Sequence, residues 1–431
     1  MNGTLRERLE ALGEAFWLRP GMLVLAGVLL GEGVVRAEGT EWLRSILPEG
    51  WIYAGGEAGA RSLLSAVAAS TIGVAGTVFS ITVAALTLAS GQMGPRLLRN
   101  FVRDGGNQAA LGIFLGTFAY ALVVLRTVRS TEEGAFVPHL GVTGALLLAL
   151  VCVAMLVWFV HHVASGINVE TVIALVHNDL CAALARLSLD RPDPPAPPPP
   201  TGGQVVALPE GGYLRALDEA ALADWAAEAG VAVVLHVRPG DHVFRGVPVA
   251  QVVPDAGGDA VERVREALTL GPRQAAAQDL EFAVRQLVEV GVRALSSGIN
   301  DPFTAMAVLD HLGDALCRLC GRHLAGAAVL RDGRAVLFRR VTDYDGLLDA
   351  MFHLVRQSGT GSAAVLIHLL DVLAAVLTAE DNPGRRAALL RHANLALAAG
   401  REGLRDRAAL AALEARHAAL PGGSGPLPSP S

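Results

Sequence analysis

Lysine is absent from this sequence, and all 35 basic residues among its 431 are arginine. Chemistry that needs a side-chain amine is therefore excluded: Schiff-base catalysis, pyridoxal phosphate attachment, lipoyl or biotinyl carriage and a Walker A phosphate loop. Charged residues are also scarce, at 18% of the chain against 52% hydrophobic residues. This composition indicates a membrane part joined to a water-soluble part. The arginines are scattered, so we expect no nucleic-acid partner.

Cysteine is sparse as well, with four residues and no pattern that implies a disulfide framework. Cys317 and Cys320 form a CRLC pair, but no second pair stands at zinc-ribbon spacing, so we favour helix packing and predict no metal site. The sequence also lacks HExxH, GxSxG and dinucleotide-binding glycine motifs. We therefore expect no enzyme activity and no cofactor.

The most informative segment runs from Ser62 to Pro95, 34 consecutive residues without Asp, Glu, Lys, Arg or His. A helix needs about 20 apolar residues to cross a bilayer, so this segment must tilt, kink or project beyond the lipid. Three further segments meet the same criterion. We predict four transmembrane spans, at about residues 18–36, 62–91, 107–125 and 138–160.

The distribution of arginine predicts the orientation of these spans. Three arginines precede the first span, and Arg96, Arg99 and Arg103 lie between the second and third. The other two loops mix arginine with glutamate. Because cytoplasmic loops carry an excess of basic residues, we expect both termini to be cytoplasmic.

After the last span the chain becomes amphipathic over residues 161–190, which predicts that this span continues into the cytosol as a helix. A proline-rich linker (191–203) then marks a domain boundary, because such runs are semi-rigid spacers. The fold class is a mainly α membrane protein: a four-helix transmembrane bundle plus a cytosolic α+β domain. That domain comprises a β-rich unit like a small half-barrel (204–258), a helical part with one strand pair around RAVLF (259–420) and a disordered tail (421–431).

Three stretches carry a resemblance to a known family: SITVAALTLASGQMGPRLLRNFVRD, LGIFLGTFAYALVVLR and RALSSGINDPFTAMAVLDHL. Together they resemble the bacterial predicted membrane proteins known as domain of unknown function 2254. The most specific parts are Gln92 to Phe101 and Ser296 to Ala305, where Ser297 replaces the proline more common in related sequences. The resemblance implies the bacterial cytoplasmic, or inner, membrane but no established activity.

Small and hydroxyl-bearing residues recur along one face of the long second span. They permit close helix packing, or they line a water-filled path for an ion. The candidate residues are Ser65, Gly73, Thr77, Ser80 and Thr87. In the third span, Gly112 and Gly116 form a GIFLG motif that indicates helix packing, with self-association of protomers as the alternative.

Directly after the long span lies a predicted cytoplasmic mouth, formed by Gln92, Arg96, Arg99 and Arg103. The three arginines are spaced i, i+3 and i+7, which places them on one helical face. They either anchor the helix to lipid head groups or form a ring of guanidinium groups that attracts anions or gates against the cytosolic domain.

Three further features have two interpretations each. Glu32, inside the first span, either snorkels to the interface or forms a proton or cation site. Asp301 either caps the helix that begins at Pro302 or binds a polar ligand together with Ser296 and Asn300. His161 and His162 beside Trp158 are expected to be interface anchors rather than metal ligands.

Two functional hypotheses follow. The first is an oligomeric ion or solute channel, or a transporter-like protein, with a cytosolic regulatory domain. The second is a non-conducting membrane scaffold or sensor whose cytosolic domain binds a partner. In both cases we expect the lipid bilayer and other copies of the chain as partners; the sequence does not specify the ion or solute.

Overall fold

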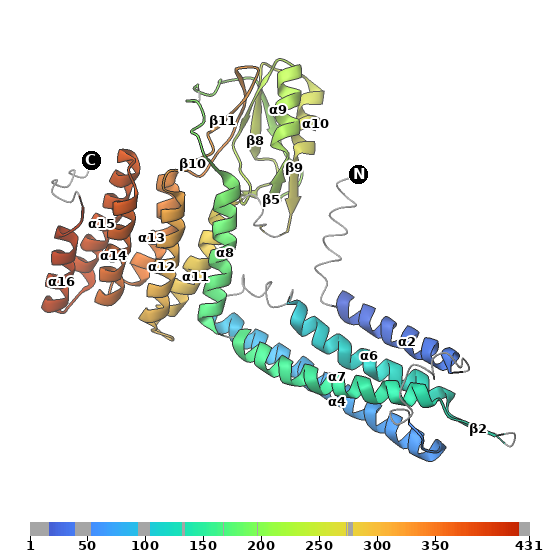
Figure 1. Ribbon diagram of the computed structural model, residues 1–431. Coiled ribbons are helices and arrows are strands. Elements are labelled where there is room, and N and C mark those ends of the chain that lie inside the picture. Colours follow the sequence, from blue (N-terminus) through green and yellow to red (C-terminus); the bar gives the residue numbers. More distant parts are fainter. Residues whose placement is uncertain are drawn as a thin grey trace. The chain divides into compact units, whose positions relative to one another are not determined.

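The computed structural model describes residues 17–38, 53–93, 104–131, 134–166, 168–195, 197–272, 274 and 279–421. The chain forms two compact units, Met1–Thr171 and Val172–Ser431. Most of the described residues lie in helices, and the sheets are small and built from short strands (Figure 1).

The first unit contains four helices that are long and apolar enough to cross a membrane: α2 (Leu18–Ala37), α4 (Glu57–Met93), α6 (Gly105–Thr127) and α7 (His139–Gly166). They correspond to the four predicted spans. A short hairpin of β1 (Arg129–Thr131) and β2 (Gly134–Phe136) joins α6 to α7 where the sequence predicted only a loop. Helix α4 begins at Glu57, five residues before the predicted span, and Glu57 and Arg61 form an ion pair along its first turn (2.9 Å).

Helix α6 is the central helix of this unit and packs against α2, α4 and α7. Its core side chains are large: Phe114 and Tyr120 are fully buried, and the Tyr120 hydroxyl donates to the carbonyl oxygen of Gly141 (3.0 Å). The outer faces of α2 and α7 instead expose large apolar side chains, such as Leu29 and Val157. An outer surface of large apolar side chains suits a lipid environment.

We predicted that the fourth span continues into the cytosol as an uninterrupted helix, and this prediction is wrong. Helix α7 ends at Gly166, and α8 (Val169–Leu187) begins after a break in which Asn168 Oδ1 accepts a hydrogen bond from the Glu170 N–H (2.9 Å). Asparagine competes for main-chain groups in this way and therefore favours helix starts over helix interiors.

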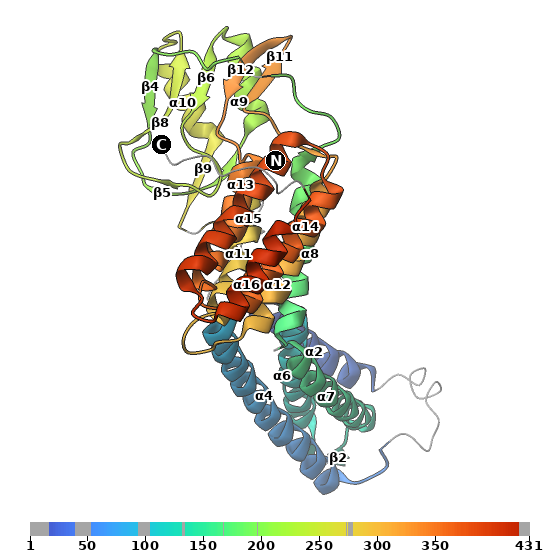
Figure 2. The same ribbon diagram turned by 90° about the vertical axis from the view of Figure 1, so that its left-hand side faces the viewer.

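Most of the second unit is helical: α11 (Leu280–Ala294), α12 (Pro302–Leu319), α13 (Tyr344–Ser358), α14 (Ala363–Ala379), α15 (Pro383–Gly403) and α16 (Arg407–Ala418). Helix α14 packs against α12, α15 and α16 (Figure 2). The core here is aliphatic, with Leu309, Leu312, Leu366 and Leu373 fully buried. Aspartate or asparagine caps most of these helices, as in α12 and α15.

The remainder of this unit forms two main sheets with α9 (Glu219–Glu228) and α10 (Gly258–Ala267). The five-stranded sheet has the order β11 (Ala328–Arg331), β12 (Arg334–Phe338), β6 (Ala232–Leu235), β8 (Pro248–Val253) and β4 (Gln204–Ala207). The three-stranded sheet has the order β7 (His242–Val243), β5 (Gly212–Leu217) and β9 (Leu268–Gly271).

The β-rich part therefore extends beyond the predicted unit at 204–258. The predicted strand pair around RAVLF exists as β11 and β12, but β12 pairs parallel with β6, so that Leu337 lies opposite Val233. A pairing between strands about 100 residues apart leaves no local pattern in the sequence. A further two-stranded pairing joins β3 (Ser188–Leu189), directly after α8, to β10 (His323–Leu324), shortly after α12.

Candidate functional site

The small-residue face of α4, defined as Ser65, Gly73, Thr77, Ser80 and Thr87, is exposed in the single chain. The opposite face of the same helix is buried by other helices of the unit, with Leu64 and Val78 almost fully covered. A Cβ added at Gly73 would meet no atom of the described residues within 4 Å. The outward side of the helix also carries larger apolar residues, namely Ile72, Phe79, Ile81 and Val83, so the small residues form a strip among them.

Three hydroxyls on this face donate to their own helix. Thr77 donates to the carbonyl oxygen of Gly73 (3.2 Å), Ser80 to that of Gly76 (2.9 Å) and Thr87 to that of Val83 (2.9 Å). A hydroxyl that donates to the i−4 carbonyl is satisfied without a partner outside the helix, which allows it to face lipid or another helix.

The GIFLG motif of α6 packs within the chain. Gly27 of α2 lies against the main chain of Gly116, and a Cβ added at Gly116 would approach the carbonyl oxygen of Leu23 to 2.7 Å. Gly112 also faces α2, at Pro20 and Leu23. The motif is thus occupied by a neighbouring helix of the same chain.

The predicted cytoplasmic mouth lies largely outside the described residues. This holds for Arg96, Arg99 and Arg103 and for the side chain of Gln92, whose main chain belongs to the last turn of α4.

Charged groups near the ends of α2 and α7 have partners. Glu32 forms ion pairs with Arg126 of α6 and with Arg36 (3.8 Å), so its carboxylate is neutralised inside the chain. His162 stacks on Trp158, with ring centroids 4.6 Å apart, and contacts Asp104 Oδ2 (2.5 Å) at the start of α6.

In the stretch Ser296 to Ala305, Asp301 is the N-cap of α12 and Pro302 its first residue. Its carboxylate accepts hydrogen bonds from the N–H of Phe303 (3.0 Å) and of Thr304 (3.2 Å) and from the Thr304 hydroxyl (2.6 Å). The Thr304 hydrogen bond holds the pKa of Asp301 below its ordinary value. Asn300 adopts a left-handed backbone (φ 50°), and Ser296 contributes through its carbonyl, which accepts from Asn300 (2.9 Å). These contacts build a helix start.

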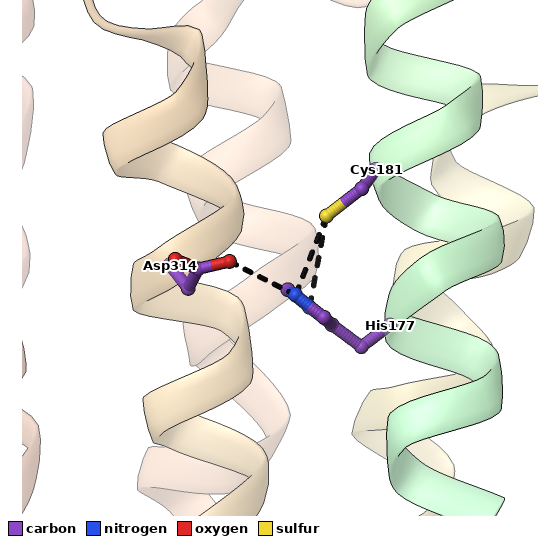
Figure 3. A group of neighbouring side chains, drawn as sticks. All are labelled: His177, Cys181 and Asp314. Carbon is purple, nitrogen blue, oxygen red and sulfur yellow. Dashed lines mark hydrogen bonds and ion pairs between the residues drawn. The ribbon is translucent and has the colours of Figure 1, made fainter.

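The structure brings together a group that the sequence analysis did not single out, called here the His177 cluster: His177 and Cys181 of α8 and Asp314 of α12 (Figure 3). His177 Nε2 lies 2.9 Å from Asp314 Oδ2 and 3.4 Å from Cys181 Sγ. All three donor atoms lie within 4.8 Å of one another. The His177 side chain is only 9% exposed, whereas that of Asp314 is 48% exposed, so the cluster opens to solvent at the carboxylate.

Two further side chains surround the His177 cluster. The ring of His311, one turn before Asp314, lies 4.6 Å from the His177 ring. Burial, followed by the nearby His177, lowers the pKa of His311. Arg318 donates to Asp314 Oδ2 (2.7 Å), and burial raises the pKa of the Cys181 thiol more than Arg318 lowers it.

A weak signal for this cluster was present in the sequence. His177 and Cys181 stand at i and i+4 in an amphipathic segment, and His311 and Asp314 stand at i and i+3 in another. Each pair alone is common on helices. Only the pairing of α8 with α12 makes one site from them.

Comparisons with known proteins identify relatives of this chain. A family model described as "Predicted membrane protein (DUF2254)" matches residues 13–375. Uncharacterized proteins of two Mycobacterium tuberculosis strains and of Mycobacterium bovis are each 33% identical over 400 residues, which cover 88% of this chain and 75% of the relative. No solved structure matches the chain.

Proposed function

The chain belongs to the DUF2254 family of predicted membrane proteins, and we propose that it is an oligomeric multi-pass membrane protein whose copies associate through the small-residue face of α4. The observation that carries this proposal is that Gly73 and Thr77 are exposed while the opposite face of α4 is buried. Small side chains let two helices approach closely, and close approach drives helix association in lipid, where no hydrophobic effect acts between helices.

The contact between α2 and α6 shows this mode of packing within the chain. There Gly27 and Gly116 allow two main chains to meet, and no larger side chain would fit. Gly73 and Gly76 of α4 offer the same kind of surface with open space in front of them. We propose a second copy of α4 as the partner, because two such glycine strips can approach each other closely.

We further propose that the protein lies in the bacterial cytoplasmic membrane with both termini cytoplasmic, which would make the second unit a cytosolic module. The support is the excess of arginine before the first span and between the second and third. We propose no catalytic activity for this protein.

Association is tested with the full-length protein reconstituted into lipid vesicles, with donor-labelled and acceptor-labelled copies mixed. Energy transfer between copies should fall as lipid dilutes the wild-type protein. Gly73→Leu should weaken association by roughly tenfold, equivalent to about 1.4 kcal/mol. Gly33→Leu is the matched control, because Gly33 is an exposed span glycine of α2 and an added Cβ would have no atom within 4 Å in the part of the chain that the structure describes.

The proposal fails if the wild-type protein shows no energy transfer at any lipid dilution, or if Gly73→Leu and Gly33→Leu behave alike. The first result indicates a monomer. The second indicates an interface that does not include α4.

Conduction of an ion or solute between the associated copies is a second candidate, favoured by the hydroxyl oxygens of Thr77, Ser80 and Thr87. Each hydroxyl donates to its own helix, which leaves its oxygen able to accept, and such oxygens can replace water around a cation. Flux into vesicles should occur with the wild-type protein and fall in Thr77→Val, which keeps the side-chain volume. Association without any flux would favour a non-conducting scaffold or sensor.

A further inference from the structure

We propose that the His177 cluster binds a divalent transition-metal ion, with Zn²⁺ as the best match, between α8 and α12. The ligands are His177, Cys181 and Asp314, and water or His311 takes the fourth position. This site is independent of the association proposed for α4.

The donor set selects the class of metal. One imidazole nitrogen, one sulfur and one carboxylate form a mixed set that suits borderline ions such as Zn²⁺ and disfavours Mg²⁺ and Ca²⁺, which prefer oxygen alone. A thiolate and a carboxylate together also balance the two positive charges of the ion. The bound site would therefore carry no net charge next to the buried His177.

The distances are close to those of a tetrahedral site. Zinc–ligand bonds of about 2.0–2.3 Å place nitrogen and sulfur about 3.6 Å apart and nitrogen and oxygen about 3.4 Å apart. The observed separations are 3.4 Å from His177 Nε2 to Cys181 Sγ and 2.9 Å from His177 Nε2 to Asp314 Oδ2. Each needs to open by only a few tenths of an ångström to admit the ion.

The arrangement does not suit a Cys-His-Asp nucleophilic relay. In such a relay the nucleophile and the carboxylate contact different ring nitrogens, so that the imidazole can pass a proton between them. Here Asp314 and Cys181 both approach Nε2 of His177, and Cys181 lies farther from Nδ1, at 3.8 Å. The sulfur and the carboxylate oxygen thus gather at the same nitrogen, as the three ligands of one ion do.

The two helices are held together independently of the cluster. Beyond the C-terminal ends of α8 and α12, β3 pairs with β10, and Arg322 donates to the hydroxyl (2.6 Å) and the carbonyl (3.1 Å) of Ser188. This brace fixes α8 against α12, so the ligands are positioned before the ion arrives. Preorganisation of this kind lowers the cost of binding.

Arg318, which contacts Asp314 Oδ2, does not close the site. Its side chain is 60% exposed, and Asp314 has a second carboxylate oxygen. A second group of possible ligands consists of Asp349, His353 and His392, and it contains no sulfur. Its carboxylate, Asp349, already forms an ion pair with Arg391. Asp345 also pairs with Arg391 (3.2 Å) and holds it in place. The His177 cluster is thus the better metal site of the two.

The test uses untagged full-length protein, purified in detergent, stripped with a chelator and titrated with Co²⁺ as a spectroscopic substitute for Zn²⁺. We expect one Co²⁺ per chain, with the charge-transfer absorption of a cobalt–thiolate bond, and displacement by added Zn²⁺. Cys181→Ser should abolish the charge-transfer band, and His177→Ala should weaken Co²⁺ binding about tenfold or more. Cys320→Ser, which removes a sulfur from the end of α12 outside the cluster, should retain the band.

The site is refuted if the wild-type protein gives no thiolate band, or if Cys181→Ser gives the same band as wild type. Loss of the band in Cys320→Ser but not in Cys181→Ser would also refute it and assign the sulfur to the CRLC pair. Circular dichroism of each metal-free variant shows whether the helices persist, so that a lost band is not mistaken for unfolding.

Discussion

Gly27 of α2 faces the main chain of Gly116 of α6 so closely that a Cβ on Gly27 would overlap the Gly116 carbonyl oxygen. Neither residue can carry a side chain while the two helices remain in place. The first and third spans are therefore joined by contact between main chains. Gly112 and Gly116, for which self-association of protomers was the alternative, pack against α2 of the same chain.

Gly27→Ala should destabilise the membrane unit by about 1–3 kcal/mol, because the added methyl group forces the helices apart. Gly33→Ala is the control: it gains the same helix propensity, and its Cβ meets nothing within 4 Å. Thermal unfolding of both variants in detergent gives the comparison. Equal midpoints would show that α2 does not pack on α6 at this point.

Glu32 and Arg126 form an ion pair at one end of the membrane unit. Glu32→Ala leaves the Arg126 charge without this partner and should cost about 0.5–1 kcal/mol, because the Arg126 side chain is largely exposed at the end of α6. The exchange of both residues, Glu32→Arg with Arg126→Glu, should recover much of the loss. Thermal midpoints of the single variant and of the exchanged pair test this, and a pair no more stable than Glu32→Ala would argue against a direct ion pair.

Asp301 caps α12, so Asp301→Ala should reduce stability by about 0.5–2 kcal/mol. Asp301→Asn keeps a capping oxygen and should restore most of it. Denaturant unfolding of the second unit within the full chain provides the measurement. Equal defects in both variants would show that the carboxylate charge, and not a capping oxygen alone, stabilises this helix start.

His392 should make the second unit sensitive to acid. Its side chain is fully buried, and burial, followed by Arg391 and His353, lowers its pKa to about 4 from an ordinary 6.5. The folded state therefore resists a proton that the unfolded state accepts, so stability is complete above pH 6.5 and declines as the pH falls toward 4. The expected loss is about 3 kcal/mol.

The measurement is the thermal midpoint of wild type and His392→Gln between pH 7 and pH 4.5. The variant should lose less stability over this interval, whereas His323→Gln, at a histidine outside this group, should follow the wild type. Parallel curves for all three proteins would show that other groups cause the acid sensitivity.

Local sequence patterns predicted much of the fold. Charge-free runs gave four apolar helices close to the expected positions, and the Asp301–Pro302 pair marked the start of α12. These predictions succeed because hydropathy and capping act over a few residues. The break at Asn168 was missed because the apolar periodicity on its two sides outweighed one weak helix-breaking residue.

Contacts between distant segments could not be predicted in this way. Parallel pairing of β12 with β6 depends on which strands meet after collapse, and no residue of RAVLF specifies that partner. The features of the candidate site fall into the same two groups, those that local patterns predict and those that depend on contacts between distant segments. The sequence by itself determined that α4 has a small-residue face, since helical periodicity fixes which residues share a side. Only the tertiary structure decided that this face points away from the chain's own helices, that the α6 glycines are covered by α2, and that His177 and Cys181 meet Asp314, because each depends on which helices pack together.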